Sequence, residues 1–295
     1  IATPTKYGHT FSGWYSDPDF ESVFTSTTMP AQNLSLYAKW TVNVSTVTFD
    51  SNGGSAVASI TQLFNTTVEQ PADPVRTGYT FSGWFIDELG TEQYYIPTMP
   101  AQDITLYAGW TANLYEINFV ENGGSTVENR DVLYGVAITA PAAPLRTGYA
   151  FAGWYSDAGL TNAYAFTTMP AENITLYAKW TINSYTITFH SNGGSAVASI
   201  TQNYGTAVVQ PADPTKTGYT FAGWYSDAGL TSAYTFTTMP AQNITLYAKW
   251  TINSYTITFN VNGGSAVASI TQDYATAVSQ PVDPTKTGYA FGGWY

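Results

Sequence analysis

The chain contains 295 residues, of which 44% are hydrophobic, 16% aromatic and only 10% charged. A net charge of −11, with only 9 Lys and Arg residues, leaves no basic surface to neutralise phosphates, so nucleic acid is excluded as an expected partner. The absence of cysteine excludes disulfides, thiol catalysis and cysteine-ligated zinc, and the many tyrosines and tryptophans predict a core of aromatic and β-branched side chains on strands.

The sequence carries no signal that places it in a membrane. The longest apolar runs, such as the one that begins at Ile174, fall far short of the roughly 20 residues that span a bilayer, so we expect no membrane insertion in this segment. No signal peptide or anchor is visible. A cysteine-free, acidic, Thr/Ser/Asn-rich composition fits an extracellular location, at a bacterial cell surface or secreted, and this location is an inference from composition.

Three motifs repeat with a period of 70 residues. Asn-Gly-Gly begins at Asn52, Asn122, Asn192 and Asn262, Gly-Trp at Gly13, Gly83, Gly153, Gly223 and Gly293, and Met-Pro at Met29, Met99, Met169 and Met239. The nine tryptophans occupy two positions of the period, one shared by Trp14, Trp84, Trp154, Trp224 and Trp294 and the other by Trp40, Trp110, Trp180 and Trp250. The chain is therefore a tandem array of small modules.

Cutting the chain before the first predicted strand of each period defines the modules. Complete modules fall at 45–114, 115–184 and 185–254, with a partial module at each end, at 1–44 and 255–295. The first partial module corresponds to the C-terminal part of a repeat and the last to the N-terminal part. Such partial modules at both ends are what we expect of a segment of a longer array.

The copy at 185–254 illustrates the first elements of a module. Residues 185–189 alternate apolar and polar side chains, which predicts a half-buried strand. Asn192 and Gly193 accept positive φ and predict a hairpin turn, after which a second strand is expected to run toward Val208. The module is therefore expected to open with a β-hairpin.

A short helix and two more strands are expected to complete the module. Asp213 is a plausible helix N-cap with Pro214 at the first helical position, so a brief helix is predicted to dock its aromatic residues, as far as Trp224, onto the sheet. The aromatic segment 234–236 and the alternating run 244–250 are predicted as a second pair of strands. A hairpin, a helix and two further strands define an α+β module of β-grasp type.

Each module closely resembles the Listeria-Bacteroides repeat, also called the internalin B-repeat. The resemblance rests on three ordered motifs: Asn192-Gly-Gly, then Pro214-Thr-Lys-Thr-Gly-Tyr-Thr-Phe-Ala-Gly-Trp-Tyr-Ser-Asp, then Met239-Pro-Ala-Gln-Asn-Ile-Thr-Leu-Tyr-Ala-Lys-Trp. It implies a ubiquitin- or SUMO-like β-grasp fold and a place in large bacterial surface proteins, where such repeats act as spacers and in some cases contact host or matrix components. It supplies no catalytic residue and no cofactor.

The recurring residues form a structural group and a surface group. The structural group comprises the core and turn residues Trp84, Trp110, Trp154, Trp180, Trp224, Trp250, Asn122, Gly123, Asn192 and Gly193. The surface group lies on the outward phase of the last predicted strand and comprises Tyr107, Tyr177 and Tyr247. These tyrosines are the candidate surface for contact with a glycan or a protein.

Residue types that could support catalysis or metal binding do not recur in a suitable pattern. His9 and His190 are each replaced by other residues in the remaining copies, so we expect neither to be a catalytic base and no Ser-His-Asp or metal set to form. The loop carboxylates represented by Asp157 and Asp227 offer too few oxygen ligands for calcium, so a turn role is expected. A lysine that recurs at one position of the period could form an intramolecular isopeptide bond. Gly109 replaces this lysine in one copy, which argues against such chemistry.

The connection between modules is short. Only Thr181, Ile182, Asn183 and Ser184 separate Trp180 of one module from Tyr185 of the next, and none of them is Gly or Pro. Such a linker favours a stiff or semi-stiff, elongated array.

The sequence therefore predicts a non-enzymatic, extracellular repeat region that acts as a stalk, spacer or fibre segment of a bacterial surface protein. We expect it to bind no cofactor and to have its neighbouring modules as partners. The alternative is a multivalent array in which each module binds a glycan or a host or matrix protein weakly and repetition supplies avidity. A further alternative is a filament in which chains join head to tail by completing each other's partial modules. A longer parent chain explains the partial modules more simply.

Overall fold

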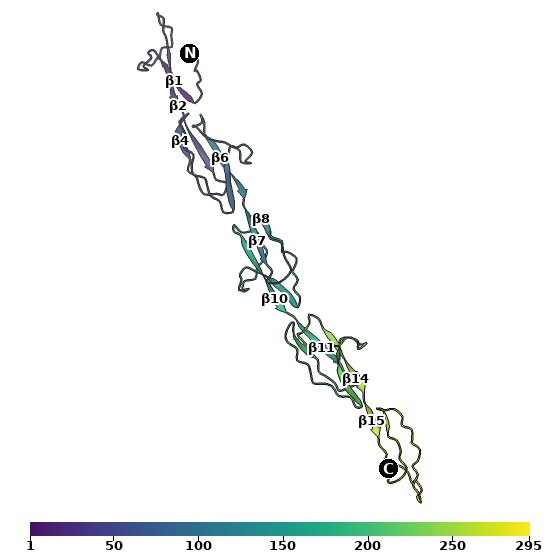
Figure 1. Ribbon diagram of the computed structural model, residues 1–295. Coiled ribbons are helices and arrows are strands. Elements are labelled where there is room, and N and C mark those ends of the chain that lie inside the picture. Colours follow the sequence, from purple (N-terminus) through teal and green to yellow (C-terminus); the bar gives the residue numbers. More distant parts are fainter. The chain divides into compact units, whose positions relative to one another are not determined.

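The computed structural model describes residues 1–295, and it is all-β, with sixteen strands in five sheets and no helix (Figure 1). The α+β prediction and the β-grasp assignment are therefore wrong. The chain divides into two compact units, Ile1–Val120, Val127–Ala142 and Tyr155–Tyr177 in one and Glu121–Thr126, Ala143–Trp154 and Ala178–Tyr295 in the other, and each is described by itself. No helix long and apolar enough to cross a membrane is present.

The strands follow the 70-residue period. The partial module at 1–44 contributes β1 (His9–Tyr15) and β2 (Tyr37–Val42), and the one at 255–295 contains most of β15 (Ser254–Ile257) and β16 (Ile270–Asp273). The complete modules contribute β3 (Val44–Asp50), β4 (Ile60–Leu63), β5 (Tyr79–Phe85) and β6 (Ile104–Ala112); β7 (Leu114–Val120), β8 (Arg130–Leu133), β9 (Tyr149–Tyr155) and β10 (Ile174–Ile182); and β11 (Ser184–His190), β12 (Ile200–Asn203), β13 (Tyr219–Tyr225) and β14 (Ile244–Ile252).

Each complete module forms one mixed four-stranded sheet. The strand orders are β4-β3-β6-β5, β8-β7-β10-β9 and β12-β11-β14-β13. In the last of these, β11 is antiparallel to β12 and parallel to β14, whereas β13 is antiparallel to β14. The first and last strands of a module are therefore neighbours in the middle of its sheet.

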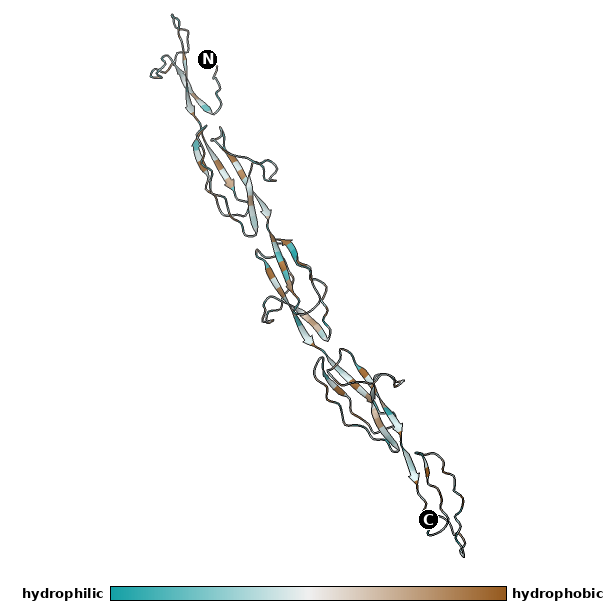
Figure 2. Ribbon diagram, viewed as in Figure 1, coloured by the Kyte–Doolittle hydropathy of each residue, from teal (hydrophilic) through white to brown (hydrophobic).

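Alternation along the sequence explains why these strands form. In β14, Leu246 and Ala248 are fully buried, whereas Thr245 before them is exposed and Tyr247 between them is only partly buried, as a period of two requires. Figure 2 shows the same alternation as brown bands that interrupt paler stretches of the strands. The predicted strands at 185–189 and 244–250 are confirmed as parts of β11 and β14.

The predicted helix is wrong: Asp213 and Pro214, which fit a helix start, lie in an irregular loop, and the aromatic residues that follow belong to the bulged strand β13. Phe221 and Trp224 both pack into the core, and their separation of three residues is typical of a helix face. In the structure the pairing of β13 with β14 shifts register between Phe221 and Gly223, and Gly223 has a φ of 114°. One extra residue in the strand places both aromatic side chains on the same side of the sheet.

Two other expectations need correction. The aromatic segment 234–236 is not a strand; it follows a single bridge between Tyr225 and Ala233, with the Tyr234 amide donating to the Trp224 carbonyl. The second strand of the hairpin is only four residues long, β12, and ends well before Val208. Both segments lie in irregular loops whose aromatic and β-branched residues serve the core.

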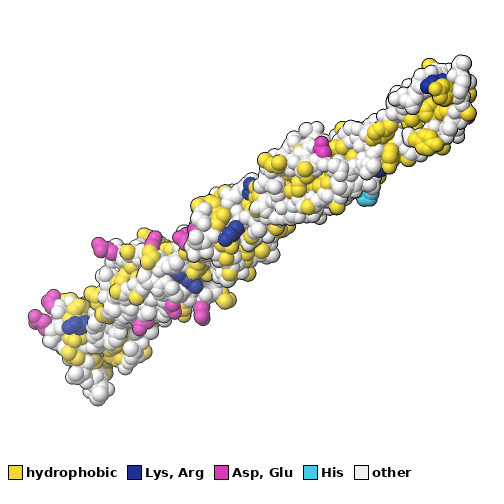
Figure 3. Space-filling model, turned by 90° about the horizontal axis from the view of Figure 1, so that it is seen from below, with side chains coloured by type: hydrophobic (Ala, Val, Ile, Leu, Met, Phe, Trp, Pro, Cys, Tyr) yellow, Lys and Arg dark blue, Asp and Glu magenta, His cyan; other side chains and the backbone are white.

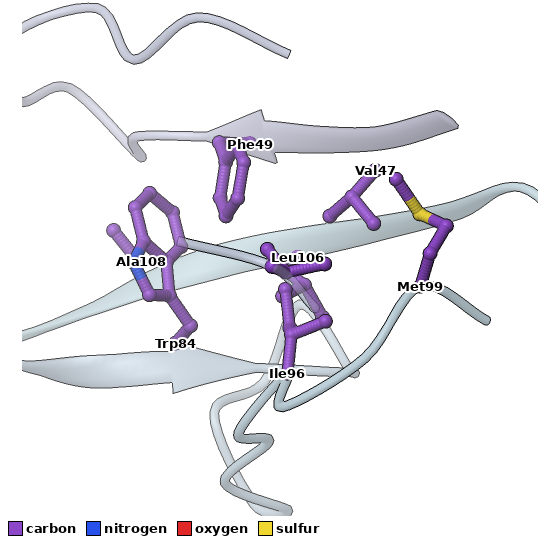
Figure 4. Close-up of a cluster of buried hydrophobic side chains, with 8 residues drawn as sticks. Val47, Phe49, Trp84, Ile96, Met99, Leu106 and Ala108 are labelled. Atoms are coloured by element: carbon purple, nitrogen blue, oxygen red, sulfur yellow. The ribbon is translucent and has the colours of Figure 1, made fainter. Parts of the chain in front are cut away.

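A layer of loop rather than a helix covers the core face of each four-stranded sheet. Figure 4 shows Ile96 and Met99, from the loop before β6, pointing toward Leu106 and Val47 on the sheet. Met99 is 1% exposed, and its amide and carbonyl pair with Thr66 and Asn65 of a second loop. In the complete modules the methionine of the Met-Pro motif is thus a core residue and not only a chain break.

Candidate functional site at the module junction

Consecutive modules are joined by a single residue that belongs to no strand. β2 ends at Val42 and β3 begins at Val44, and the same one-residue gap recurs after β6, β10 and β14. The residue in the gap is always asparagine, and we call these residues the junction asparagines: Asn43, Asn113, Asn183 and Asn253. A polypeptide connection of one residue leaves little freedom between the strands that it joins.

Each junction asparagine hydrogen-bonds to both of the modules that it connects. The Asn113 amide donates to the Gly78 carbonyl of the preceding module at 2.9 Å, and its carbonyl accepts from the Tyr134 amide of the following module at 2.8 Å. The same two bonds occur at the other junctions with distances of 2.8–3.0 Å. The backbone of the connection is thereby held on both sides.

Side chains add a further bond at most junctions. Thr10 donates to Oδ1 of Asn43 at 2.7 Å, and Thr80 makes the equivalent bond to Asn113 at 2.6 Å, as Thr220 does to Asn253. At Asn183 the threonine position is Ala150, and the asparagine Nδ2 instead donates to the Tyr185 hydroxyl at 3.3 Å.

A buried glycine of one module receives an aromatic ring of the next. Gly78 has a φ of 79°, and a Cβ at this position would overlap the ring of Tyr134. Tyr134 also packs edge-on against Tyr79, with ring centroids 5.4 Å apart. The same arrangement recurs where Phe64, Tyr204 and Tyr274 cover Gly8, Gly148 and Gly218. The absent glycine side chain is what lets the ring approach.

A cation connects the junction to the Asn-Gly turn of its own module. Nη1 of Arg76 donates to the Asn52 carbonyl at 3.0 Å, and its guanidinium carbon lies 4.2 Å from the Tyr79 ring centroid. Arg146, Lys216 and Lys286 occupy the same position and make the same pair of contacts. Because the ring under the cation touches the next module, turn, cation and junction form one continuous set of contacts.

The structure places the predicted turn residues together with one class of tryptophan. Asn192 and Gly193 both have positive φ, 47° and 83°, and the Gly194 amide closes the turn onto the Ser191 carbonyl. Nε1 of Trp250 donates to the same Ser191 carbonyl at 2.9 Å. Asn122 and Gly123 have the same signs of φ, and Trp110 and Trp180 make the equivalent indole bonds.

The second class of tryptophan lies in the core. Trp84, Trp154 and Trp224 are 7%, 4% and 2% exposed, and Trp224 packs against Phe189 with ring centroids 4.8 Å apart.

The candidate contact tyrosines are half-buried and lie on the face of the sheet that points away from the core. Tyr107 lies opposite Phe85 across the antiparallel pair, and Tyr247 lies opposite Tyr225. Tyr247 also contacts His190, whose strand neighbours it on the other side, with ring centroids 5.6 Å apart. Tyr177 occupies the equivalent position on β10, paired in register with Val120. The structure thus places each tyrosine within a cross-strand group.

The loop carboxylates bind backbone amides. Asp227 accepts from the Ser232 amide at 2.7 Å and from the Thr231 amide at 3.2 Å, and these bonds hold the pKa of the carboxyl below its ordinary value. The amides of Glu92, Asn162 and Glu21 lower the pKa of Asp87, Asp157 and Asp17 in the same way. No group of three or more His, Asp or Glu residues that could hold a metal is present.

Sequence reasoning missed the junction residues. The junction asparagine, the glycine of Thr-Gly-Tyr and the aromatic residue at the Tyr134 position all recur with the 70-residue period, which was the available signal. Sequence reasoning could not find them because their partners lie in the neighbouring module, so no pattern within one module indicates their role.

The two histidines lie in different modules. The His9 imidazole hydrogen-bonds to the Tyr7 carbonyl, and the His190 imidazole to the side chain of Asn192.

These features define a tandem array of all-β modules whose connections are held by hydrogen bonds and aromatic contacts. The model of the Listeria-Bacteroides repeat domain matches residues 1–39, 46–109, 115–179, 185–249 and 255–295. The chain belongs to the Listeria-Bacteroides repeat family, and the resemblance inferred from the three motifs is confirmed.

Curated relatives carry similar arrays. A putative Gly-rich membrane protein of Evansella cellulosilytica is 41% identical over 310 residues, which covers 99% of this chain and 36% of the relative. A putative membrane protein of the same organism is 42% identical over 88% of this chain and 40% of its own length. Internalin H of Listeria monocytogenes is 47% identical over 120 residues, covering 39% of this chain and 22% of the relative. The chain thus spans less than half the length of each of these relatives.

Proposed function

We propose that this chain is a non-enzymatic spacer or stalk segment of a bacterial surface protein, in which the junctions limit bending between modules. The observation that carries the proposal is the junction asparagine, which bonds the preceding module through its amide and the following module through its carbonyl. A spacer that must hold a distance needs such connections, whereas a flexible tether does not.

The packing around the junction supports this proposal. The ring of Tyr134 fills the space over Gly78 and touches Tyr79, so bending at Asn113 would separate aromatic surfaces as well as hydrogen bonds. Every junction repeats this arrangement with small changes of residue.

The relatives support a place at the cell surface. Two of them are named as membrane proteins, and the third is an internalin. Figure 3 shows a face on which charged side chains are few, with hydrophobic side chains in yellow among the uncharged side chains and backbone in white. A sparsely charged surface suits a segment whose work is separation rather than recognition of a charged partner.

A multivalent binding array is the second candidate. The observation that favours it is the repeated cross-strand aromatic pair, Tyr107 with Phe85 and Tyr247 with Tyr225. Half-exposed rings at a fixed period could stack on sugar rings, and avidity would come from repetition. Binding of the chain to immobilised glycans and matrix proteins, lost when Tyr107, Tyr177 and Tyr247 are all replaced by serine, would establish this function.

Distance measurement across one junction tests the spacer proposal. Thr147 and Thr217 are exposed and one period apart, on either side of Asn183, and the chain has no native cysteine, so spin labels on introduced cysteines report only this distance. We expect a single narrow distance distribution, which broadens when six Gly and Ser residues are inserted after Asn183. An equally broad distribution in both proteins would refute the proposal.

A further inference from the structure

We infer that each complete module is a mechanical clamp that resists tension applied along the chain. In the module at 185–254, the entering strand β11 and the leaving strand β14 are parallel neighbours, paired from Ile187 with Ile244 to His190 with Tyr247. The module at 45–114 has the same pairing, from Val47 with Ile104 to Asp50 with Tyr107. The clamp deepens the spacer proposal, but it is a property of one module alone.

The direction of the strands decides how tension reaches their hydrogen bonds. Two parallel strands have their N-terminal ends together, so the point where the chain enters β11 and the point where it leaves β14 lie at opposite ends of the pair. Tension along the chain therefore slides β11 past β14. Sliding loads every bond of the pair at once, whereas pulling apart two neighbouring strand ends breaks the bonds one after another.

Side chains extend this parallel pairing at both of its ends. Before the first backbone pair, Oδ1 of Asn243 accepts from the Thr186 amide at 2.8 Å. Beyond the last pair, Nδ2 of Asn192 donates to the Ala248 carbonyl at 2.7 Å. Asp103 and Asn52 make the equivalent bonds in the module at 45–114, and the entry and exit bonds of the intervening module come from Asn173 and Asn122.

The core opposes the same sliding motion. Ile187 on β11 and Leu246 on β14 are completely buried, and Phe189 packs against Trp224. Displacing β11 relative to β14 would move all of these side chains out of register with the layer that covers them. Close packing leaves no intermediate arrangement with the same burial, so the hydrogen bonds and the core should fail together.

The bonds at the two ends give Asn192 a role beyond its turn. Its positive φ belongs to the turn after β11, while its side chain ties that turn to the leaving strand. At the other end of the pair, Asn243 lies just before β14, and its side chain binds the Thr186 amide on β11. Each side chain thus bridges the two strands between which tension acts.

Single-molecule pulling in two directions tests the clamp. In the full-length chain, the double variant Ser184→Cys and Thr251→Cys places handles at opposite ends of the β11–β14 pair, so tension shears it. The double variant Ser184→Cys and Gln242→Cys places them at the same end, so tension unzips it. All three positions are exposed. Circular dichroism and tryptophan fluorescence like those of the native chain are the check that each variant is folded.

We expect the module to unfold at a several-fold higher force in shear than in unzipping, with a length gain of about 3.4 Å per freed residue in both. The force reports the rate of forced unfolding and not equilibrium stability, so a mere difference in stability cannot produce a dependence on direction. Equal forces in the two directions would overturn the inference. Both handle pairs act within one module, so this result is independent of whether the junctions are stiff.

A second variant tests the side-chain bond at the entry end. Asn243→Ala removes the acceptor for the Thr186 amide and should lower the shear force while changing the unzipping force much less. Asn243→Asp keeps the acceptor, as Asp103 does at the equivalent position, and should restore the force. An unchanged shear force in Asn243→Ala would show that the bond takes no part in the clamp.

Discussion

Gly78 of one module and Tyr134 of the next are in direct contact, and no side chain could be added to the glycine without overlapping the ring. Between them lies Asn113, whose amide bonds the Gly78 carbonyl and whose carbonyl bonds the Tyr134 amide. The pair therefore shows how a connection of one residue becomes a packed interface. We expect neighbouring modules to stabilise each other through it, which matters for 70-residue domains that lack disulfides.

Replacing Gly78 with alanine should disrupt this interface. Gly135, with a φ of 76°, provides a matched control, because a Cβ there meets nothing within 4 Å. Both substitutions carry the cost of a left-handed backbone, about 1–2 kcal/mol, but only Gly78→Ala displaces the Tyr134 ring. Hydrogen exchange of the Tyr134 amide should accelerate strongly in Gly78→Ala and little in Gly135→Ala. Equal exchange in the two variants would show that the contact does not order the junction.

The cation that links turn and junction should depend on charge more than on shape. Lys216 makes the same contacts as Arg76, so Arg76→Lys is expected to be nearly neutral. Arg76→Met keeps the length of the side chain but loses the hydrogen bond and the cation–π contact, and should destabilise its module by about 1 kcal/mol. Urea unfolding followed by tryptophan fluorescence measures the difference. A Met variant as stable as the Lys variant would contradict this role.

The methionine of the Met-Pro motif should behave according to its burial rather than its place in the repeat. Met239 is completely buried, and Met29, at the same position of the period, is 85% exposed. Met239→Ala should therefore destabilise its module by about 2–5 kcal/mol, whereas Met29→Ala should change stability by less than about 0.5 kcal/mol. Urea midpoints for the two variants decide the point. Similar shifts in both would mean that the loop layer contributes little to the core.

The loop held by Asp227 should loosen in acid. Because backbone bonds lower the pKa of this carboxyl in the folded state, their contribution to stability is complete above the ordinary carboxyl pKa and is lost as the pH falls through the lowered value. The Ser232 amide should thus remain protected from hydrogen exchange in mild acid and lose protection only at lower pH. In Asp227→Ala the protection should be absent at neutral pH as well. A pH-independent protection in the native chain would be incompatible with this account.

The sequence predicted the repeat, the central strands and the turns, because each depends on residues close together in the chain. The alternation at 244–250 determines which face of β14 is buried, and Asn192-Gly193 supplies the two positive φ angles that its turn requires. These features need no knowledge of the rest of the fold. The Listeria-Bacteroides resemblance followed from the same local motifs.

The helix and the junction could not be read in this way. Asp213-Pro214 fits the start of a helix as well as a loop that leads into a strand, and only the pairing of the residues that follow with β14 distinguishes the two. The partner of Gly78 is 56 residues away in a different module, so the local sequence around either residue gives no indication of the contact. Features that depend on pairing across the sheet or between modules need the structure.

Small-angle X-ray scattering of the full chain is the most direct test of the central claim that the junctions make this array a spacer of defined length. Three complete modules that add about 30–40 Å each should give a maximum dimension above about 100 Å with a rod-like cross-section. Inserting Gly-Ser segments after each junction asparagine should replace this profile with that of a flexible chain of beads. A compact particle, or a native profile already as flexible as that of the loosened variant, would contradict the claim and favour the binding array.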